Sequence, residues 1–201
     1  MARIPVEERR EALIDAAFRV IGEQGLSRAS TRAIVAEAGM SLASFHYAFE
    51  SRDQLLELLI TEVLASEQRA ILPANLKGKS LTALLTEGLQ GYLDHLRADP
   101  GREQAMLELT QYALRSALPL AEGQYAQYTR FALESLELAA RQTDSEWTVP
   151  TPVVARLLVA LTGGFTISWL IDRDDAHARA SVEAAATAIA SLATSKRRSQ
   201  Q

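Results

Sequence analysis

STRAIVAEAGMSLASFHYAFESR, residues 30–52, is the stretch that decides the fold of this 201-residue chain. Its first half predicts a short helix with an apolar face that includes Ile34, and Gly39 supplies a residue that can end this helix at positive φ. Ser41 is placed to cap a second helix, whose Phe45 points back at the first. The pattern therefore predicts two short helices joined by a tight turn, which is a helix-turn-helix.

The same residues resemble the signature of the TetR (tetracycline repressor) family of transcriptional regulators, with the family's spacing throughout. The stretch that carries the resemblance consists of Ile34, Val35, Ala38, Gly39, Ser41, Phe45, His46, Tyr47, Ala48, Phe49, Ser51, Arg52, Asp53 and Leu55. Upstream, the first helix and its closing glycine also resemble the family at Leu13, Ile14, Ala16, Ala17, Phe18 and Gly25. Four positions depart from the usual residues, namely Val35, Ala43, His46 and Ala48.

This resemblance covers about the first sixty residues and implies the fold of the family. We therefore expect an all-α protein of about nine helices. Residues 1–50 would form a three-helix DNA-binding domain that contains the helix-turn-helix. Residues 51–201 would form a helical domain for effector binding and dimerisation.

Apolar periodicity and helix-breaking residues divide the chain into helix-length pieces. Pro5 precedes several acids, which suits the positive end of a helix dipole, and this first helix is expected to end near Gly25. With Pro119 as an interruption, the later helices are expected at 51 to about 72, 80–97, 101 to about 117, 125 to about 141, 152–171, and 176 to about 195. Residues 142–152 read as a loop, and no alternating strand pattern occurs.

Composition is that of an ordinary soluble protein. The chain is 48% hydrophobic and 23% charged, and it lacks cysteine, so a disulfide framework and a thiolate site are excluded. No run reaches the roughly eighteen apolar residues of a membrane span, and the N-terminus has no apolar export segment. These features predict a cytoplasmic protein without a membrane partner.

The net charge of −4 argues against a generally basic nucleic-acid binder. Residues 1–52 carry seven basic and seven acidic residues, so this part is neutral. Arg28, Arg32 and Arg52 nevertheless cluster around the two short helices, while most of the acids belong to the first helix. Binding to double-stranded DNA would depend on this local placement, which a homodimer would double.

The resemblance and the chemistry of the side chains together predict the DNA contacts. Leu42, Ala43 and Ser44 open the recognition helix and would face base edges. Phosphates would be held by Thr31, Ser41, His46, Tyr47 and Arg52, with Arg28 and Arg32 adding positive charge. A packing role is the alternative for Tyr47, which could lie between Phe45 and Phe49, and for His46.

Aromatic residues are concentrated after residue 90, which favours a small apolar or aromatic effector. Each of them could equally belong to the core. The effector-binding candidates are Tyr92, Met106, Tyr112, Tyr128, Phe131, Phe165 and Trp169.

The helix expected at 152–171 is apolar on nearly all sides and therefore needs burial on more than one of them. The last helix is rich in alanine, which permits close helix approach. The resemblance implies that these two helices pair with their copies in a four-helix interface; the alternative is the core of a monomer. The predicted interface residues are Leu157, Leu161, Phe165, Ser168, Val182, Ala185, Ile189 and Leu192.

Other classes of function find little support. The three histidines are scattered, and no metalloprotease, hydrolase, dinucleotide or P-loop motif occurs, so we predict neither an enzyme nor a cofactor. The spacing of Asp172, Asp174, Asp175 and His177 favours a hydrophilic turn over a metal site. An architectural DNA-binding protein without effector remains an alternative, although it would not need so much apolar helix. The favoured function is that of a ligand-responsive repressor, which binds a palindromic operator as a homodimer.

Overall fold

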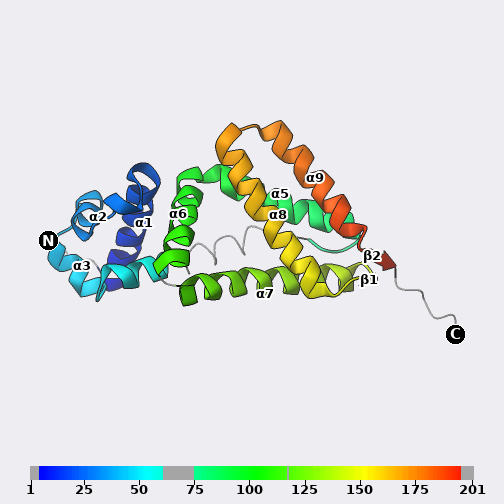
Figure 1. Ribbon diagram of the computed structural model, residues 1–201, viewed down its shortest axis with the longest axis horizontal. Coiled ribbons are helices and arrows are strands. Elements are labelled where there is room, and N and C mark those ends of the chain that lie inside the picture. Colours follow the sequence, from blue (N-terminus) through cyan, green and yellow to red (C-terminus); the bar gives the residue numbers. More distant parts are fainter. Residues whose placement is uncertain (1–4, 61–74, 117, 196–201) are drawn as a thin grey trace. The chain divides into compact units, whose positions relative to one another are not determined.

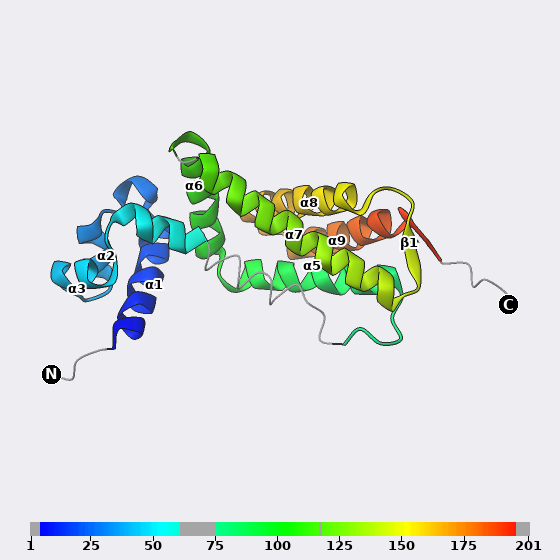
Figure 2. The same ribbon diagram turned by 90° about the horizontal axis from the view of Figure 1, so that it is seen from below.

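The computed structural model describes residues 5–60, 75–116 and 118–195, and nearly all of them are helical (Figures 1 and 2). The α-helices are α1 (Val6–Gln24), α2 (Thr31–Glu37), α3 (Leu42–Ala48), α5 (Leu81–Ala98), α6 (Pro100–Ser116), α7 (Leu118–Gln142), α8 (Thr151–Asp172) and α9 (Asp175–Ala190). A ninth helical segment covers 52–60, and a short 3-10 helix, η1 (Leu26–Arg28), joins α1 to α2. The predicted all-α class is confirmed.

These elements belong to two compact units. Among the described residues, the first unit comprises 5–60 and 99–124, and the second comprises 75–98 and 125–195. Helix α6 therefore belongs to the same unit as the helix-turn-helix, and α7 begins in the first unit and continues into the second. The functional division into 1–50 and 51–201 stays a prediction.

The helix-turn-helix forms as its local sequence predicts. The Ser30 hydroxyl accepts a hydrogen bond from the Ala33 amide at 3.2 Å, which caps α2. Gly39 follows α2 with φ of 64°, a conformation that a glycine adopts without steric cost. Ser41 then caps α3 by accepting from the Ser44 amide at 3.2 Å. The predicted Ser41 cap and the turn at Gly39 are confirmed, and the Ser30 cap is an additional finding.

The first unit has an apolar core beneath these two helices. Phe45 of α3 is 1% exposed, and its ring lies 5.4 Å from that of Phe49. Helix α1 packs against both α2 and α3. The other large side chains buried here are Leu13, Ile21, Ile34, Leu55, Leu56, Leu59 and Ile60. Burial of this size holds α3 on a rigid support.

The second unit is built on α5, which packs against α8 and α9. Its core is rich in leucine from α5 and also takes residues from α7, α8 and α9. The central buried residues are Leu84, Leu85, Leu89, Leu93, Leu96, Leu136, Val154, Ala155, Trp169, Val182, Ala186 and Ile189.

Helix α7 and the two strands differ from the prediction. Helix α7 begins at Leu118 and not at Tyr125, because Pro119 lies in its first turn, where a proline breaks no helical hydrogen bond.

Strands β1 (Ser145–Trp147) and β2 (Ala193–Ser195) form an antiparallel pair in which Glu146 pairs with Thr194. A loop and the end of the last helix were expected at these two places. Three residues are too few for an alternating pattern to be visible in the sequence. The helix expected at 51 to about 72 is described only over 52–60, and the rest of that prediction lies outside the described residues.

Candidate nucleic-acid interface

Helix α3 presents one face to the core and the other to solvent. Phe45 and Ala48 are buried, whereas Leu42 is 42% exposed and Tyr47 is 58% exposed. The three residues predicted to face base edges lie in the first turn of the helix; Leu42 and Ala43 are exposed, and Ser44 is half-buried. An exposed leucine beside small residues suits contact with a thymine methyl group in a major groove.

The predicted phosphate-binding residues surround this face. Arg28, Arg32 and His46 are exposed, and Thr31 is half-buried at the start of α2. The Ser41 hydroxyl caps α3 and lies 3.0 Å from the Ser44 hydroxyl, so both hydroxyls also have bonds within the protein. The structure thus brings the predicted side chains to one region of the first unit, while their contacts with DNA stay a prediction.

Tyr47 does not pack between the two phenylalanines. Its ring is exposed, and the guanidinium of Arg9 lies over it at 5.1 Å from the ring centroid. Arg10, the next residue of α1, lies over Phe49 and donates to the Ala48 carbonyl at 3.4 Å. The N-terminal turns of α1 therefore bring two cations to α3. Sequence reasoning missed them, because 38 residues separate the partners and no local pattern reports the contact.

Arg52 is engaged within the protein. Its Nε donates to the Ala29 carbonyl at 2.7 Å, and one terminal nitrogen donates to the Leu26 carbonyl at 3.0 Å. A guanidinium has five N–H donors, so the remaining ones could still meet a phosphate. The structure shows, however, that this arginine connects the helical segment 52–60 to the turn that precedes α2.

The predicted effector-binding residues are divided between the two units. Met106 and Tyr112 belong to the first, and Tyr92, Tyr128, Phe131, Phe165 and Trp169 belong to the second. The Tyr92 hydroxyl lies 2.5 Å from that of Thr166, and both residues are buried. The indole N–H of Trp169 donates to Asp175 at 2.9 Å.

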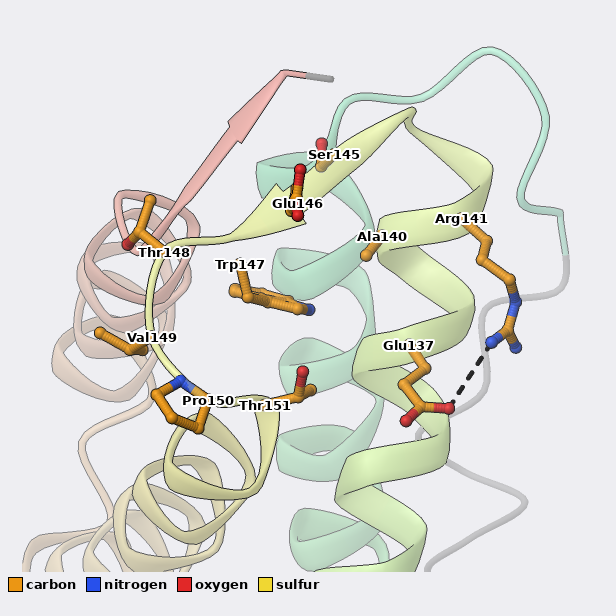
Figure 3. Close-up of a pocket in the computed structure, with 10 residues that line it drawn as sticks. All are labelled: Glu137, Ala140, Arg141, Ser145, Glu146, Trp147, Thr148, Val149, Pro150 and Thr151. Carbon is orange, nitrogen blue, oxygen red and sulfur yellow. Dashed lines mark ion pairs between the residues drawn. The ribbon is translucent and has the colours of Figure 1, made fainter. Parts of the chain in front are cut away.

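A polar pocket of about 530 Å³ lies elsewhere in the second unit, beside β1. Figure 3 shows the Trp147 ring at its centre and the ion pair between Glu137 and Arg141 at its rim. None of the seven predicted effector-binding residues lines it. This pocket therefore gives the predicted effector set no support.

The predicted dimer interface needs a correction at Val182, Ala185 and Ile189. These side chains are 1%, 8% and 0% exposed within a single chain, because this face of α9 packs on α5. The sequence showed an apolar seam but not which partner covers it. The other predicted positions are exposed or half-buried, and large exposed side chains gather along α8 at Val153, Leu157, Ile167 and Ile171.

Helix α8 is the one helix among the described residues that is long and apolar enough to cross a membrane by length and composition, with a mean hydropathy of 1.7. A core helix passes the same test, and Val154, Ala155, Thr166 and Trp169 of α8 are buried in the second unit.

The acidic turn between α8 and α9 has a structural role. Asp174 caps α9 by accepting from the amides of His177 and Ala176 at 2.9 and 3.0 Å, and these bonds lower the pKa of its carboxyl group. Asp175 accepts from Trp169 and pairs with Arg97 at 2.6 Å. No group of three or more potential metal ligands occurs in the described part of the chain.

Comparison with known proteins adds evidence of descent. Residues 13–59 match the model of the bacterial regulatory proteins of the tetR family. The HTH-type nicotine-responsive transcriptional repressor HdnoR of Paenarthrobacter nicotinovorans is 30% identical over 176 residues, which are 86% of this chain and 89% of that protein. The protein is thus related along most of its length to a bacterial regulator.

Solved structures show the same fold. A TetR-family transcriptional regulator from Rhodococcus sp. superposes with a TM-score of 0.76 at 19% identity, covering 91% of this chain and 99% of that one. The multidrug binding protein EbrR, complexed with imidazole, has a TM-score of 0.60 at 28% identity and covers 89% of each chain. HdnoR and the Rhodococcus protein are transcriptional regulators and not enzymes, as the sequence indicated.

Proposed function

Because this chain belongs to the TetR family and is a transcriptional regulator, we propose that it is a repressor that binds a palindromic DNA operator as a homodimer and leaves it when a small molecule binds. The observation that carries the proposal is the exposed face of α3, which is held on a buried aromatic support. The chain is also related to a repressor over 86% of its length. A regulator of this kind acts in the cytoplasm, where its operator is.

The N-terminal residues of α3 would read bases, and the surrounding basic and polar residues would hold phosphates. We add Arg9 to the set predicted from the sequence, because it lies over Tyr47 beside the exposed face of α3. The cations are few, so each contributes appreciably to affinity in a chain with a net charge of −4.

A second copy of the chain would cover the exposed face of α8. Val153 and Ile171 are 18 residues apart, about five helical turns, so they share one side of the helix with Leu157 and Ile167. An exposed apolar stripe of this length marks an interaction surface. Several exposed residues of α9 are small, at Ala180, Ala184, Thr187 and Ala188, which permits close approach of a partner helix there. Ser168 of the predicted interface is exposed on α8 as well, whereas Leu161 and Phe165 are half-buried and pack partly against the core of the second unit.

The effector would be a small aromatic or apolar molecule, bound in the second unit by the five candidates that belong to it, Tyr92, Tyr128, Phe131, Phe165 and Trp169. Two of the proteins compared above support an aromatic nitrogen heterocycle as the class, since one is nicotine-responsive by name and the other holds imidazole. Effector would favour a spacing of the two recognition helices that no longer matches successive major grooves, so effector and operator would oppose each other reciprocally.

Selection of sequences from a random duplex pool, at a stated salt near physiological, tests the proposal. We expect a palindrome whose half-sites are about 34 Å, one helical turn, or a multiple of it apart. A panel of aromatic nitrogen heterocycles, each added to the operator complex, should contain compounds that release the DNA. A pool without enriched sequences would refute the operator, and an operator affinity that no member of the panel changes would refute the effector class.

A further inference from the structure

The turn η1, between α1 and the helix-turn-helix, is held mainly through its backbone. It follows Gly25, whose φ is 86°, and ends at Arg28; Ala29 then leads to Ser30, which caps α2. Leu26 is half-buried and the other two residues are exposed, so their side chains contribute little packing. Hydrogen bonds to this backbone therefore contribute to the position of the chain that leads into α2.

Two side chains from distant parts of the sequence supply these bonds. The carboxylate of Glu108, on α6, accepts from the Leu26 amide at 2.5 Å. Arg52 donates to the carbonyls of Leu26 and Ala29 from another direction. Both are charge-assisted bonds, which are roughly twice as strong as bonds between neutral groups. The amide and the carbonyl of Leu26 are thus each bonded to a charged side chain.

Helix α6 is itself packed against α1, so the backbone that carries Glu108 is held in place relative to α1. A Cβ on Gly22 would lie 2.6 Å from the Gly101 carbonyl oxygen, which means that the two helices meet backbone to backbone. The guanidinium of Arg102 lies over Phe18 at 4.1 Å and 3.6 Å from Asp15. Glu108 follows Gly101 by seven residues, or about two helical turns, which brings its carboxylate to the turn beyond the end of α1.

We propose that Glu108 is a positioning residue for operator binding, which holds the entry of the helix-turn-helix from α6. This inference rests on the proposed function. Without the carboxylate oxygen, the Leu26 amide loses its partner and the turn is anchored only through its carbonyls. The core around Ile34 and Phe45 stays intact, so α2 and α3 keep their fold. What changes is the precision with which the pair is oriented, and base contacts depend on that precision more than phosphate contacts do.

Variants of Glu108 separate geometry from charge. Glu108→Asp keeps the charge but withdraws the oxygen by one methylene group, and Glu108→Gln removes the charge but keeps an oxygen in reach. We expect Glu108→Asp and Glu108→Ala to lower operator affinity by about fivefold to tenfold. The affinity of these two variants for random duplex should change by less than about twofold. Glu108→Gln should keep most of the wild-type affinity for the operator. Glu23→Ala is the control, because it removes an exposed carboxylate close to the same turn.

The Leu26 amide gives a readout that does not require DNA. Its hydrogen exchange should become faster in Glu108→Ala and Glu108→Asp, while the wild-type rate should be kept in Glu23→Ala. Should Glu108→Ala not fold, the Asp and Gln pair carries the comparison alone. Equal operator affinity in the Asp variant, the Gln variant and wild type would overturn the positioning role. Equal losses on operator and on random duplex would overturn it too, since only general binding would then have changed.

Failure of the proposed function would look different. If wild-type protein selected no sequence, the operator itself would be refuted, and a positioning role in its binding with it. The exchange rates of the Leu26 amide would still report whether Glu108 holds the turn.

Discussion

Replacement of Gly22 by alanine tests the close crossing of α1 and α6. The new Cβ would lie 2.6 Å from the Gly101 carbonyl oxygen and 3.1 Å from its carbon, and these are backbone atoms that no rotamer change can move. Gly123→Ala is a matched control in the same unit, because a Cβ there has no heavy atom within 4 Å. Both glycines lie inside helices, so both replacements gain the same helix propensity.

The magnitude follows from two opposing contributions. Alanine in a helix interior is more stable than glycine by about 0.5–1 kcal/mol, which Gly123→Ala should show in full. Overpacking in a close contact costs about 1–3 kcal/mol. We therefore expect the free energy of unfolding of Gly22→Ala to lie about 1–3 kcal/mol below that of Gly123→Ala.

Urea unfolding followed by circular dichroism measures this difference, at one protein concentration because a dimer makes stability depend on it. Thermal unfolding should agree, with about 2–4 °C for each kcal/mol in a chain of this size. If Gly22→Ala were stabilised as much as Gly123→Ala, α1 and α6 would not meet at their backbones, and α6 would not be fixed to α1 as the role of Glu108 requires.

Three further outcomes follow from single contacts. Arg9→Ala should lower the slope of log affinity for DNA against log salt by about 1 for each protomer, because one phosphate contact is lost. Arg179→Ala, which removes an exposed arginine of α9, is the control and should leave this slope unchanged. Equal slopes for the two variants would show that Arg9 does not belong to the DNA interface. Ile167→Asp should give monomers in sedimentation equilibrium, whereas Leu114→Asp, at an equally exposed leucine of α6, should not; a dimer that survives at Ile167 would exclude the α8 face. Burial, and then the neighbouring Asp99, raise the pKa of the Glu103 carboxyl from 4.5 to about 7, so the folded state binds this proton more tightly than the unfolded state does. The free energy of unfolding should therefore fall as the pH rises from about 4.5 to about 7. Glu103→Gln should abolish that fall in urea unfolding measured across this pH range, and an unchanged profile would contradict the assignment.

The family and the helix-turn-helix could be predicted from the sequence because their determinants are local. Ser30, Gly39 and Ser41 act through bonds and dihedral angles within a few residues of themselves. The same holds for most helices, whose periodic apolar faces can be read in any window of a dozen residues. Where the local signal was misread, as at Pro119, the reason was also local, since a proline is tolerated in a first turn.

The partners of individual side chains could not be predicted in this way. Arg52 had the side chain and the sequence position of a phosphate ligand, yet its guanidinium also donates hydrogen bonds to two carbonyls more than twenty residues away. Val182 and Ile189 had the pattern of an interface and proved to be core. Arg9 reached Tyr47 without any signal in the sequence.

Taken alone, the sequence determined that this chain is all-α, where its recognition helix lies and to which family it belongs, because helix periodicity, caps and a glycine at positive φ act over short distances. Only the tertiary structure decided that α6 is part of the unit that carries the helix-turn-helix and that Glu108 bonds the turn before α2. Such contacts join residues 82 positions apart, and they depend on how whole helices pack. A one-dimensional pattern contains the face of each helix, but not the partner that the face meets.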